Sequence, residues 1–488
     1  MRYAKAWLTM LSAAAAAAAG CRVPALTFPA EPCMKADSMI GYDTDADGRA
    51  DFFFCRAADG RYSQIGYDRD GDARPDSLID LDAADPRQCR HLVLILDGIP
   101  YEAMREFHQA GHLREFTAPA VVIPPYPAMT DLALEDALGY MPAQAVEAKF
   151  FSRSRRRVVG GARDYLAGRN EPFAHLINYR VSPIYDAFAY LWPKPVFEKE
   201  LNDIMRRWRQ RGEVEMVAYS VASAAMGTRM GKEGHLYTLR RCEQLIHQVI
   251  FETGGLAKIT VFSDHGQTGV PARNARLDQY LRQKGWRLSD RIVADRDVAL
   301  IEFGLVTYAG LSTRRPRELV DDLMGCEAVD LCSYLDGDAV IVRGKDSAAE
   351  IRSPDNGKTF VYKALRGDPL RLGPLVGPGG QVDGRELLAR GVEGRHPYPD
   401  ALYRLWRAHT TLVENPPDVM VSLHSQWYAG KDSFAGLVDI KSTHGGLSWE
   451  GSASFLMSTA APIPGPLRSG DVPRVMERIF GRPFRYCR

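Results

Sequence analysis

The chain has 488 residues, of which 45% are hydrophobic and 25% are charged, a composition typical of a globular protein. Its 62 Lys and Arg side chains nearly balance 61 Asp and Glu side chains, which gives a formal net charge of +1. This balance argues against a general polyanion-binding protein, so we expect no nucleic acid as a bulk partner. The length suits one large domain or a few ordinary ones.

Residues 1–20 have a basic start followed by a short, alanine-rich apolar run, which is typical of a signal peptide for export and too short for a membrane span. The sequence Ala18-Ala-Gly-Cys21 resembles the end of a bacterial lipoprotein signal, which implies a lipid anchor on Cys21. Arg22 stands where an aspartate is associated with inner-membrane retention, so the resemblance implies an outer-membrane lipoprotein facing the periplasm or surface. The alternative is cleavage after small residues, which would release a soluble periplasmic protein.

Residues 21–88 are expected to form an anchor, a tether and an aspartate-rich segment. Two stretches carry aspartates at the first, third, fifth and ninth positions of a loop: Asp43, Asp45, Asp47 and Asp51, then Asp68, Asp70, Asp72 and Asp76. Carboxylates at this spacing predict calcium loops. The glutamate that ends an EF-hand loop is absent, so they resemble thrombospondin-type or dockerin-like loops. Solvated acidic turns are the alternative.

Seven cysteines besides Cys21 lie in this exported chain, where disulfides can persist. They are Cys33, Cys55, Cys89, Cys242, Cys326, Cys332 and Cys487. The odd number leaves at least one thiol unpaired, and their spacing fits no cysteine metal site.

From residue 89 onward, short apolar runs alternate with amphipathic stretches. Strands are predicted at 92–96, 174–178, 214–219, 258–263 and 418–422, and helices at 196–211 and 233–253. This alternation predicts an α/β fold with a mostly parallel sheet covered by helices on both faces. Residues 328–365 contain short runs separated by turn residues, which predict a small antiparallel β insertion.

Polar residues follow two of the predicted strands. Asp97 comes after the run 92–96, and Asp264-His265 come after the run 258–263; ligands bind at the carboxyl ends of such strands. Thr130 precedes leucines at near-helical spacing, so it is expected to open a helix whose free N–H groups favour an anion. Taken singly, these residues also fit an ordinary turn or helix cap. Together they offer three oxygens and one nitrogen, a set suited to zinc.

Four motifs occur in a particular order: Leu96-Asp-Gly98, Pro127-Ala-Met-Thr130, Ser263-Asp-His-Gly266 and Thr443-His-Gly-Gly446. The ordered set, over residues 89–488, resembles the alkaline phosphatase superfamily and most closely its type I phosphodiesterase/nucleotide pyrophosphatase branch. The resemblance implies an alkaline-phosphatase-like fold, two zinc ions and a covalent phospho-enzyme. It also implies that Thr130 is the nucleophile, that Asp97, Thr130, Asp264 and His265 surround one zinc, and that His444 belongs to the other.

The chain departs from the family pattern at the second zinc site. Where the family has an aspartate and, four residues later, a histidine, this chain has Ser223 and Gly227, and neither is a normal zinc ligand. His235 is near in sequence, but its spacing does not suit a simple replacement.

Two hypotheses follow for the function. The first is a metal-dependent hydrolase of phosphodiesters or phosphomonoesters, with one firmly held metal or a second site built partly from His444. The second is a pseudoenzyme with a binding or structural role at the cell envelope. The intact Thr130 favours the hydrolase, whose expected partners are a phosphoester substrate and, through the lipid anchor, a membrane.

Overall fold

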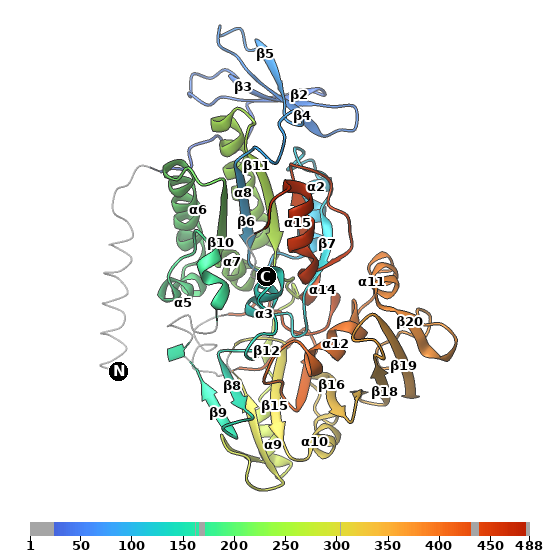
Figure 1. Cartoon of the computed structure of the whole chain (residues 1–488). Helices are drawn as coiled ribbons and strands as arrows, with labels where there is room; N and C mark the ends of the chain where they lie inside the picture. The colour runs from blue at the N-terminus through green and yellow to red at the C-terminus, as the bar shows by residue number, and fades with distance from the viewer. Residues whose placement is uncertain (1–23, 162, 165–170, 303, 431–438, 485–488) are drawn as a thin grey trace, which may run out of the picture.

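The computed structural model describes residues 24–161, 163–164, 171–302, 304–430 and 439–484 (Figure 1). The predicted signal peptide, Cys21 and Cys487 lie outside these residues. No helix within the described ranges is both long enough and apolar enough to cross a membrane. The six cysteines from Cys33 to Cys332 are free thiols.

A five-stranded antiparallel sheet forms the N-terminal part of the described chain (Figure 1). Its strands are β1 (Met34–Lys35), β2 (Met39–Tyr42), β3 (Phe52–Arg56), β4 (Tyr62–Tyr67) and β5 (Ser77–Asp80). The two aspartate loops connect β2 to β3 and β4 to β5. The sheet packs on helix α8 (Lys232–Thr253): the ring centroids of Phe54 and His247 lie 4.5 Å apart, and those of Phe52 and Phe251 lie 5.1 Å apart.

The residues just before this sheet are docked on the same surface. The backbone N–H of Ala25 donates to Asn202 Oδ1 at 2.6 Å, and that of Thr27 donates to Gln248 Oε1 at 2.8 Å. Phe28 is buried among aromatic rings of the sheet and of α8. Within the segment expected to be a tether, the chain therefore packs against the protein from Ala25 onward.

A six-stranded sheet has the order β10-β6-β11-β23-β7-β24. The strands are β6 (His91–Leu96), β7 (Ala120–Ile123), β10 (Glu215–Ser220), β11 (Lys258–Ser263), β23 (Ser454–Ser458) and β24 (Leu467–Arg468). Strands β10, β6 and β11 are parallel and fully buried, and they confirm the strands predicted near 92–96, 214–219 and 258–263. Strand β23 runs antiparallel to both β11 and β7.

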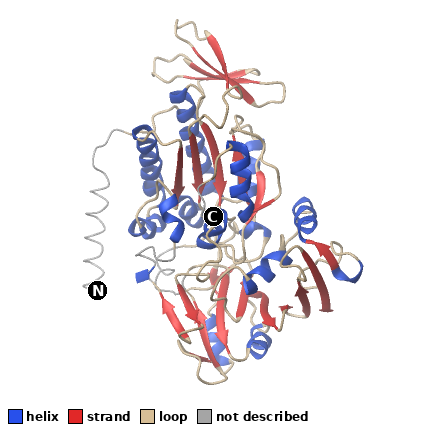
Figure 2. Ribbon diagram, in the orientation of Figure 1, coloured by secondary structure: helices blue, strands red, loops and turns tan. Residues whose placement is uncertain are grey.

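A nine-stranded sheet forms the other large layer of strands, in the order β13-β14-β15-β21-β16-β17-β18-β19-β20 (Figure 2). Its strands are β13 (Arg287–Leu288), β14 (Asp297–Ile301), β15 (Tyr308–Thr313), β16 (Val329–Asp336), β17 (Ala339–Gly344), β18 (Ser347–Arg352), β19 (Thr359–Arg366), β20 (Gln381–Asp383) and β21 (Val419–Leu423). Every pair in this sheet is antiparallel except β13 with β14. Two small pairs complete the strands: β8 (Lys149–Ser152) with β9 (Arg157–Gly160), and β12 (Arg273–Asn274) with β22 (Trp427–Tyr428).

The remaining helices lie beside the six-stranded and nine-stranded sheets (Figure 2). They are α2 (Tyr101–Gln109), α3 (Thr130–Ala137), α5 (Pro183–Leu191), α6 (Pro193–Gln210), α7 (Ala222–Met230), α9 (Leu277–Gln283), α10 (Pro316–Leu323), α11 (Gly384–Glu393), α12 (Ala401–Thr410), α14 (Trp449–Ser452) and α15 (Val472–Phe480), with the short 3₁₀ segments η1 (Pro172–Leu176), η2 (Pro378–Gly380) and η3 (Ser469–Asp471). Helices α6 and α8 correspond to the predicted helices at 196–211 and 233–253, and α3 begins at Thr130 as expected.

The prediction of one mostly parallel sheet covered by helices on both faces is wrong. The fold is α/β with several sheets that are mostly antiparallel or mixed. The short connections between strands explain the difference. Strands β16 to β19 follow one another through short turns, and strands joined by short turns pair antiparallel. The antiparallel strands expected at 328–365 are present, but they belong to the nine-stranded sheet rather than to a small insertion. The strand predicted at 174–178 is absent, and its first three residues are the end of η1.

Candidate metal centre

Asp97 and Asp264 come together because of the register between two parallel strands. Leu96 of β6 is paired with Ser263 of β11, so the aspartates that follow these residues leave the sheet side by side. Both are buried, with 4% of Asp97 and none of Asp264 exposed. This is the expected edge, where the carboxyl ends of parallel strands meet.

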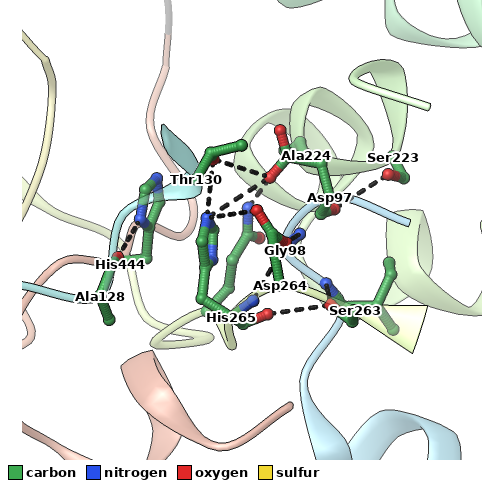
Figure 3. A network of polar contacts seen from close by, with 12 residues as sticks. Asp97, Gly98, Ala128, Thr130, Ser223, Ala224, Ser263, Asp264, His265 and His444 are labelled. Atoms are coloured by element: carbon green, nitrogen blue, oxygen red, sulfur yellow. Dashed lines mark hydrogen bonds and ion pairs between the residues drawn. The ribbon is translucent and has the colours of Figure 1, made fainter. Parts of the chain in front are cut away.

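Four side chains converge at this edge (Figure 3). His265 Nε2 lies 3.1 Å from Thr130 Oγ1, 3.4 Å from Asp97 Oδ1 and 3.5 Å from Asp264 Oδ2. Thr130 Oγ1 also lies 3.4 Å from Asp97 Oδ1. Each of the four residues thus places one oxygen or nitrogen atom within 3.5 Å of at least one of the others. The buried group Asp97, Asp264 and His265 can hold a metal ion, because one ligand atom from each lies within 4.8 Å of the others.

In the carboxylates of Asp97 and Asp264, one oxygen accepts hydrogen bonds from surrounding groups and the other faces the centre. Asp264 Oδ1 accepts hydrogen bonds from the backbone N–H groups of Gly98 and His265, both at 3.0 Å, whereas its buried Oδ2 has no hydrogen-bond partner. Tyr219 donates its hydroxyl to Asp97 Oδ2 at 2.6 Å, which leaves Oδ1 toward Thr130. Burial raises the pKa of Asp264 to about 6, because the ionised form loses its hydration.

His265 presents an unprotonated ring nitrogen to the centre. Its Nδ1 lies 2.8 Å from the carbonyl oxygen of Gly266, and since a carbonyl can only accept, Nδ1 carries the hydrogen. Burial lowers the pKa of His265 to about 4, so the ring is neutral at neutral pH. The lone pair on Nε2 then points at the Thr130 hydroxyl and the two carboxylates. This is the state that a metal ligand requires.

Thr130 is the first residue of α3, and His444 adjoins the segment that leads into this helix. His444 donates from Nδ1 to the carbonyl of Ala128 at 2.8 Å, and the N–H of Ala128 donates to the carbonyl of Gly445 at 3.1 Å. The rings of His444 and His265 are stacked with centroids 3.8 Å apart (Figure 3). Burial lowers the pKa of His444 to about 3. His444 therefore lies beside the four-atom centre without belonging to its close group.

A buried guanidinium holds the two loops of the centre together. Arg404 is 2% exposed and donates to the carbonyls of Pro125, 3.3 Å away, and Leu447, 3.2 Å away. It also donates to Ser452 Oγ at 2.9 Å. These contacts join the segment before Thr130 to the segment after His444. Burial lowers the pKa of Arg404 to about 10, which leaves it charged.

Ser223 and Gly227, at the positions of the second expected zinc site, both lie in α7. Ser223 Oγ donates toward the carbonyls of Asp97, at 2.9 Å, and Ser220, at 2.7 Å. The hydroxyl of Ser223 is therefore used in hydrogen bonds to the backbone. Gly227 has no side chain, and the buried side chains of Gln267 and His235 lie against it. Among the described residues, no group of three possible metal ligands forms at these positions.

The aspartate loops bring together part of each predicted set. One oxygen from each of Asp43, Asp45 and Asp47 lies within 4.8 Å of the others, and the same holds for Asp68, Asp70 and Asp76. Asp51 is outside the first set and accepts from the N–H and hydroxyl of Thr44, while Asp72 is outside the second and accepts from the N–H of Arg74. Both loops have the same internal pattern, since Asp43 and Asp68 each accept several backbone N–H groups.

Three residues of the centre were not predicted: Tyr219, Ser263 and Gln267. Ser263 Oγ accepts from the N–H of Ile99 at 2.9 Å and donates to the carbonyl of His265 at 3.0 Å, which fixes the turn after β11. Tyr219 and Ser263 are the last residues of predicted strands, and a position at the carboxyl end of a strand would have indicated that they lie near the centre. Gln267 follows the Ser263-Asp-His-Gly266 motif, but nothing local to the sequence indicates its contact with α7.

No protein-family model matches the chain, and no curated protein is significantly similar to it.

Proposed function

We propose that the chain is a metal-dependent phosphoester hydrolase of the alkaline phosphatase superfamily, with zinc as its metal and Thr130 as its nucleophile. The observation that carries the proposal is the set of separations among Asp97 Oδ1, Thr130 Oγ1 and His265 Nε2, which are 3.1 to 3.4 Å. Ligands of a tetrahedral zinc at bonds of about 2.0 Å lie about 3.3 Å apart. The Asp264 oxygen, 3.5 Å from His265 Nε2, supplies the fourth position.

The chemistry of the ligand atoms supports the same fit. The buried Asp264 Oδ2 lacks a hydrogen-bond donor, and such an orphaned carboxylate oxygen is costly unless a cation compensates it. Two carboxylates, a hydroxyl and a neutral imidazole are a combination of oxygen and nitrogen ligands that zinc accepts. Asp97, Thr130, Asp264 and His265 would hold the ion.

The residues around Thr130 favour attack by its hydroxyl on phosphorus. Asp97 Oδ1 and His265 Nε2 both lie within reach of the Thr130 hydroxyl, and both can accept its hydrogen bond. The first backbone N–H groups of α3 have no partner inside the helix and favour a phosphoryl group beside Thr130. When bound, zinc lowers the pKa of a coordinated hydroxyl and balances negative charge on phosphoryl oxygens.

The reaction we propose has two steps. The Thr130 oxygen forms a bond to phosphorus, the bond from phosphorus to the leaving alcohol breaks, and the alcohol departs with a proton. Water then cleaves the phosphothreonine and regenerates the Thr130 hydroxyl with release of the phosphate product. The same residues suit both steps, because each passes through a transition state with charge on the phosphoryl oxygens.

The experiment is a hydrolysis assay with p-nitrophenyl monoesters and diesters in the presence of zinc. We expect Thr130→Ala to lower the rate at least about 1,000-fold, as removal of a nucleophile does in other enzymes. Thr130→Ser keeps a hydroxyl and is the matched control, which should retain most of the activity. Acid quenching followed by mass spectrometry should find phosphate on the peptide that contains Thr130.

A pseudoenzyme is the competing outcome of that assay. A parent protein that binds zinc through Asp97, Asp264 and His265 but is no more active than Thr130→Ala on every substrate would refute the hydrolase. We also propose that the protein is exported and carries a lipid on Cys21. The composition of residues 1–20 supports this part of the proposal.

A further inference from the structure

The start of α7 adjoins the metal centre at the place where the superfamily resemblance requires a second zinc ion. Ser223 and Gly227 lie four residues apart on α7, so they share one face of the helix. Ser223 is fully buried, and its hydroxyl contacts the carbonyl of Asp97 at 2.9 Å. The face that would carry the second set of ligands therefore contacts the backbone of Asp97.

The volume in front of Gly227 is filled by two buried side chains. A Cβ atom built on Gly227 would lie 2.1 Å from Gln267 Oε1 and 2.2 Å from His235 Nε2. Contacts below 3.0 Å do not occur for real Cβ atoms, so no side chain at position 227 can coexist with this arrangement. Both side chains are buried, since 2% of Gln267 and 3% of His235 is exposed.

Hydrogen bonds hold Gln267 and His235 in this position, and we refer to them as the Gln267–His235 pair. Gln267 Nε2 donates to the carbonyl of Ala224 at 3.1 Å, and since a carbonyl only accepts, the orientation of the amide is fixed. Gln267 Oε1 then lies 3.0 Å from His235 Nε2, which must carry the hydrogen. The nitrogen of His235 that reaches α7 thus has no lone pair for a metal.

We infer that this chain binds a single metal ion, held by Asp97, Thr130, Asp264 and His265, and that the Gln267–His235 pair occupies the space of the second. The inference rests on the metal-binding part of the proposed function. A neutral amide and a neutral imidazole then stand in place of a divalent cation, and the amide lies against Gly98, the residue after Asp97. His444, which the resemblance assigns to the second ion, has no partner ligand from α7 to share a metal with it.

The first experiment counts zinc in the full-length protein. Equilibrium dialysis against zinc, with excess calcium to occupy the aspartate loops, is followed by elemental analysis. The variant Asp97→Asn/Asp264→Asn provides the background to subtract. We expect one zinc per chain above this background. Two zinc ions would overturn the inference and leave the proposed function standing, whereas no zinc would overturn both.

A second experiment uses Mn²⁺ to distinguish one bound metal ion from two, and its result does not depend on an accurate protein concentration. The parent protein loaded with Mn²⁺ should give the electron paramagnetic resonance spectrum of an isolated ion. A spectrum of two coupled ions, of the kind expected when metals lie about 4 Å apart, would overturn the inference.

The third experiment reverses the replacement. In the variant Ser223→Asp/Gly227→His/His235→Ala/Gln267→Ala, the filled space is emptied and the expected ligands are restored, so we expect the count to rise from one zinc to two. The variant His235→Ala/Gln267→Ala is the matched control, which empties the space without adding ligands and should still bind one. A rise to two in this control would also support the inference, because the pair alone would then be excluding the second ion. A count that stays at one in the four-residue variant would overturn it.

Discussion

Replacing Asp264 by Asn should have opposite effects on stability without and with zinc. In the metal-free protein, Asp264 is fully buried and its Oδ2 has no hydrogen-bond donor, so its charge is costly. Asn keeps the shape of the side chain and an oxygen that can accept from Gly98 and His265. It removes the charge that burial disfavours. It also removes one ligand, so the variant should lose the stabilisation that zinc confers on the parent.

The size of the effect follows from the pKa of Asp264. Burial raises this pKa from 3.8 in the unfolded chain to about 6 in the folded protein. Well below pH 3.8 the group is protonated in both states, and well above pH 6 it is ionised in both, so the metal-free parent loses stability as the pH rises between these limits. A rise of about 2 pH units at 1.36 kcal/mol per unit corresponds to about 3 kcal/mol.

Urea unfolding in EDTA at pH 4 and pH 7.5 measures this loss. The free energy of unfolding of Asp264→Asn minus that of the parent should increase by about 2.5 kcal/mol between the two pH values, because the unfolded carboxyl is already partly ionised at pH 4. At a zinc concentration 100 times its Kd and pH 7.5, the parent should gain about 2.7 kcal/mol and the variant much less. The exposed Asp346 provides a control as Asp346→Asn. A difference that does not change with pH, or equal stabilisation of both proteins by zinc, would refute the reasoning.

Three further predictions concern other parts of the molecule. Calcium should raise the Tm of the parent but not of Asp43→Ala/Asp68→Ala, because these residues anchor the two aspartate loops; a Tm that ignores calcium in both would count against calcium binding. Arg404→Met should lower the free energy of unfolding by about 2 to 6 kcal/mol, since it leaves the buried carbonyls of Pro125 and Leu447 without their donor at about 1 to 3 kcal/mol each, and unchanged urea unfolding would contradict this role. Cells fed labelled palmitate should label the parent and not Cys21→Ala, and an unlabelled mature parent would exclude the lipid anchor.

The sequence was sufficient to predict the strands that build the metal centre. The run that became β6 and the run that became β11 are short, apolar and followed at once by Asp97 and Asp264, so local pattern and position agree. The helix at Thr130 was likewise marked by leucine spacing. These features depend on neighbours within a few residues, and that is the range over which periodicity is informative.

The arrangement of the sheets depends on contacts that local pattern does not contain. Strand β23 lies antiparallel between β11 and β7, although it is separated from β11 by nearly 200 residues of sequence. The turn at Gly231, which has a φ of 62°, lets α8 start directly after α7 and returns His235 to Gly227. Because the Gln267–His235 pair is assembled from two separate segments, the sequence showed that ligands were missing at α7 but not what fills their place.

If Cys21 carries a lipid, the docking of Ala25 and Thr27 limits how far the protein can stand from a membrane. Their backbone N–H groups are held by Asn202 of α6 and Gln248 of α8. Cys21 precedes Ala25 by four positions, and a fully extended chain of that length spans about 14 Å. With a lipid on Cys21, the face formed by α6 and α8 would be kept close to the bilayer surface. Diffusion of the protein would then be confined to a thin layer, where phosphoesters carried by the membrane are the most accessible substrates.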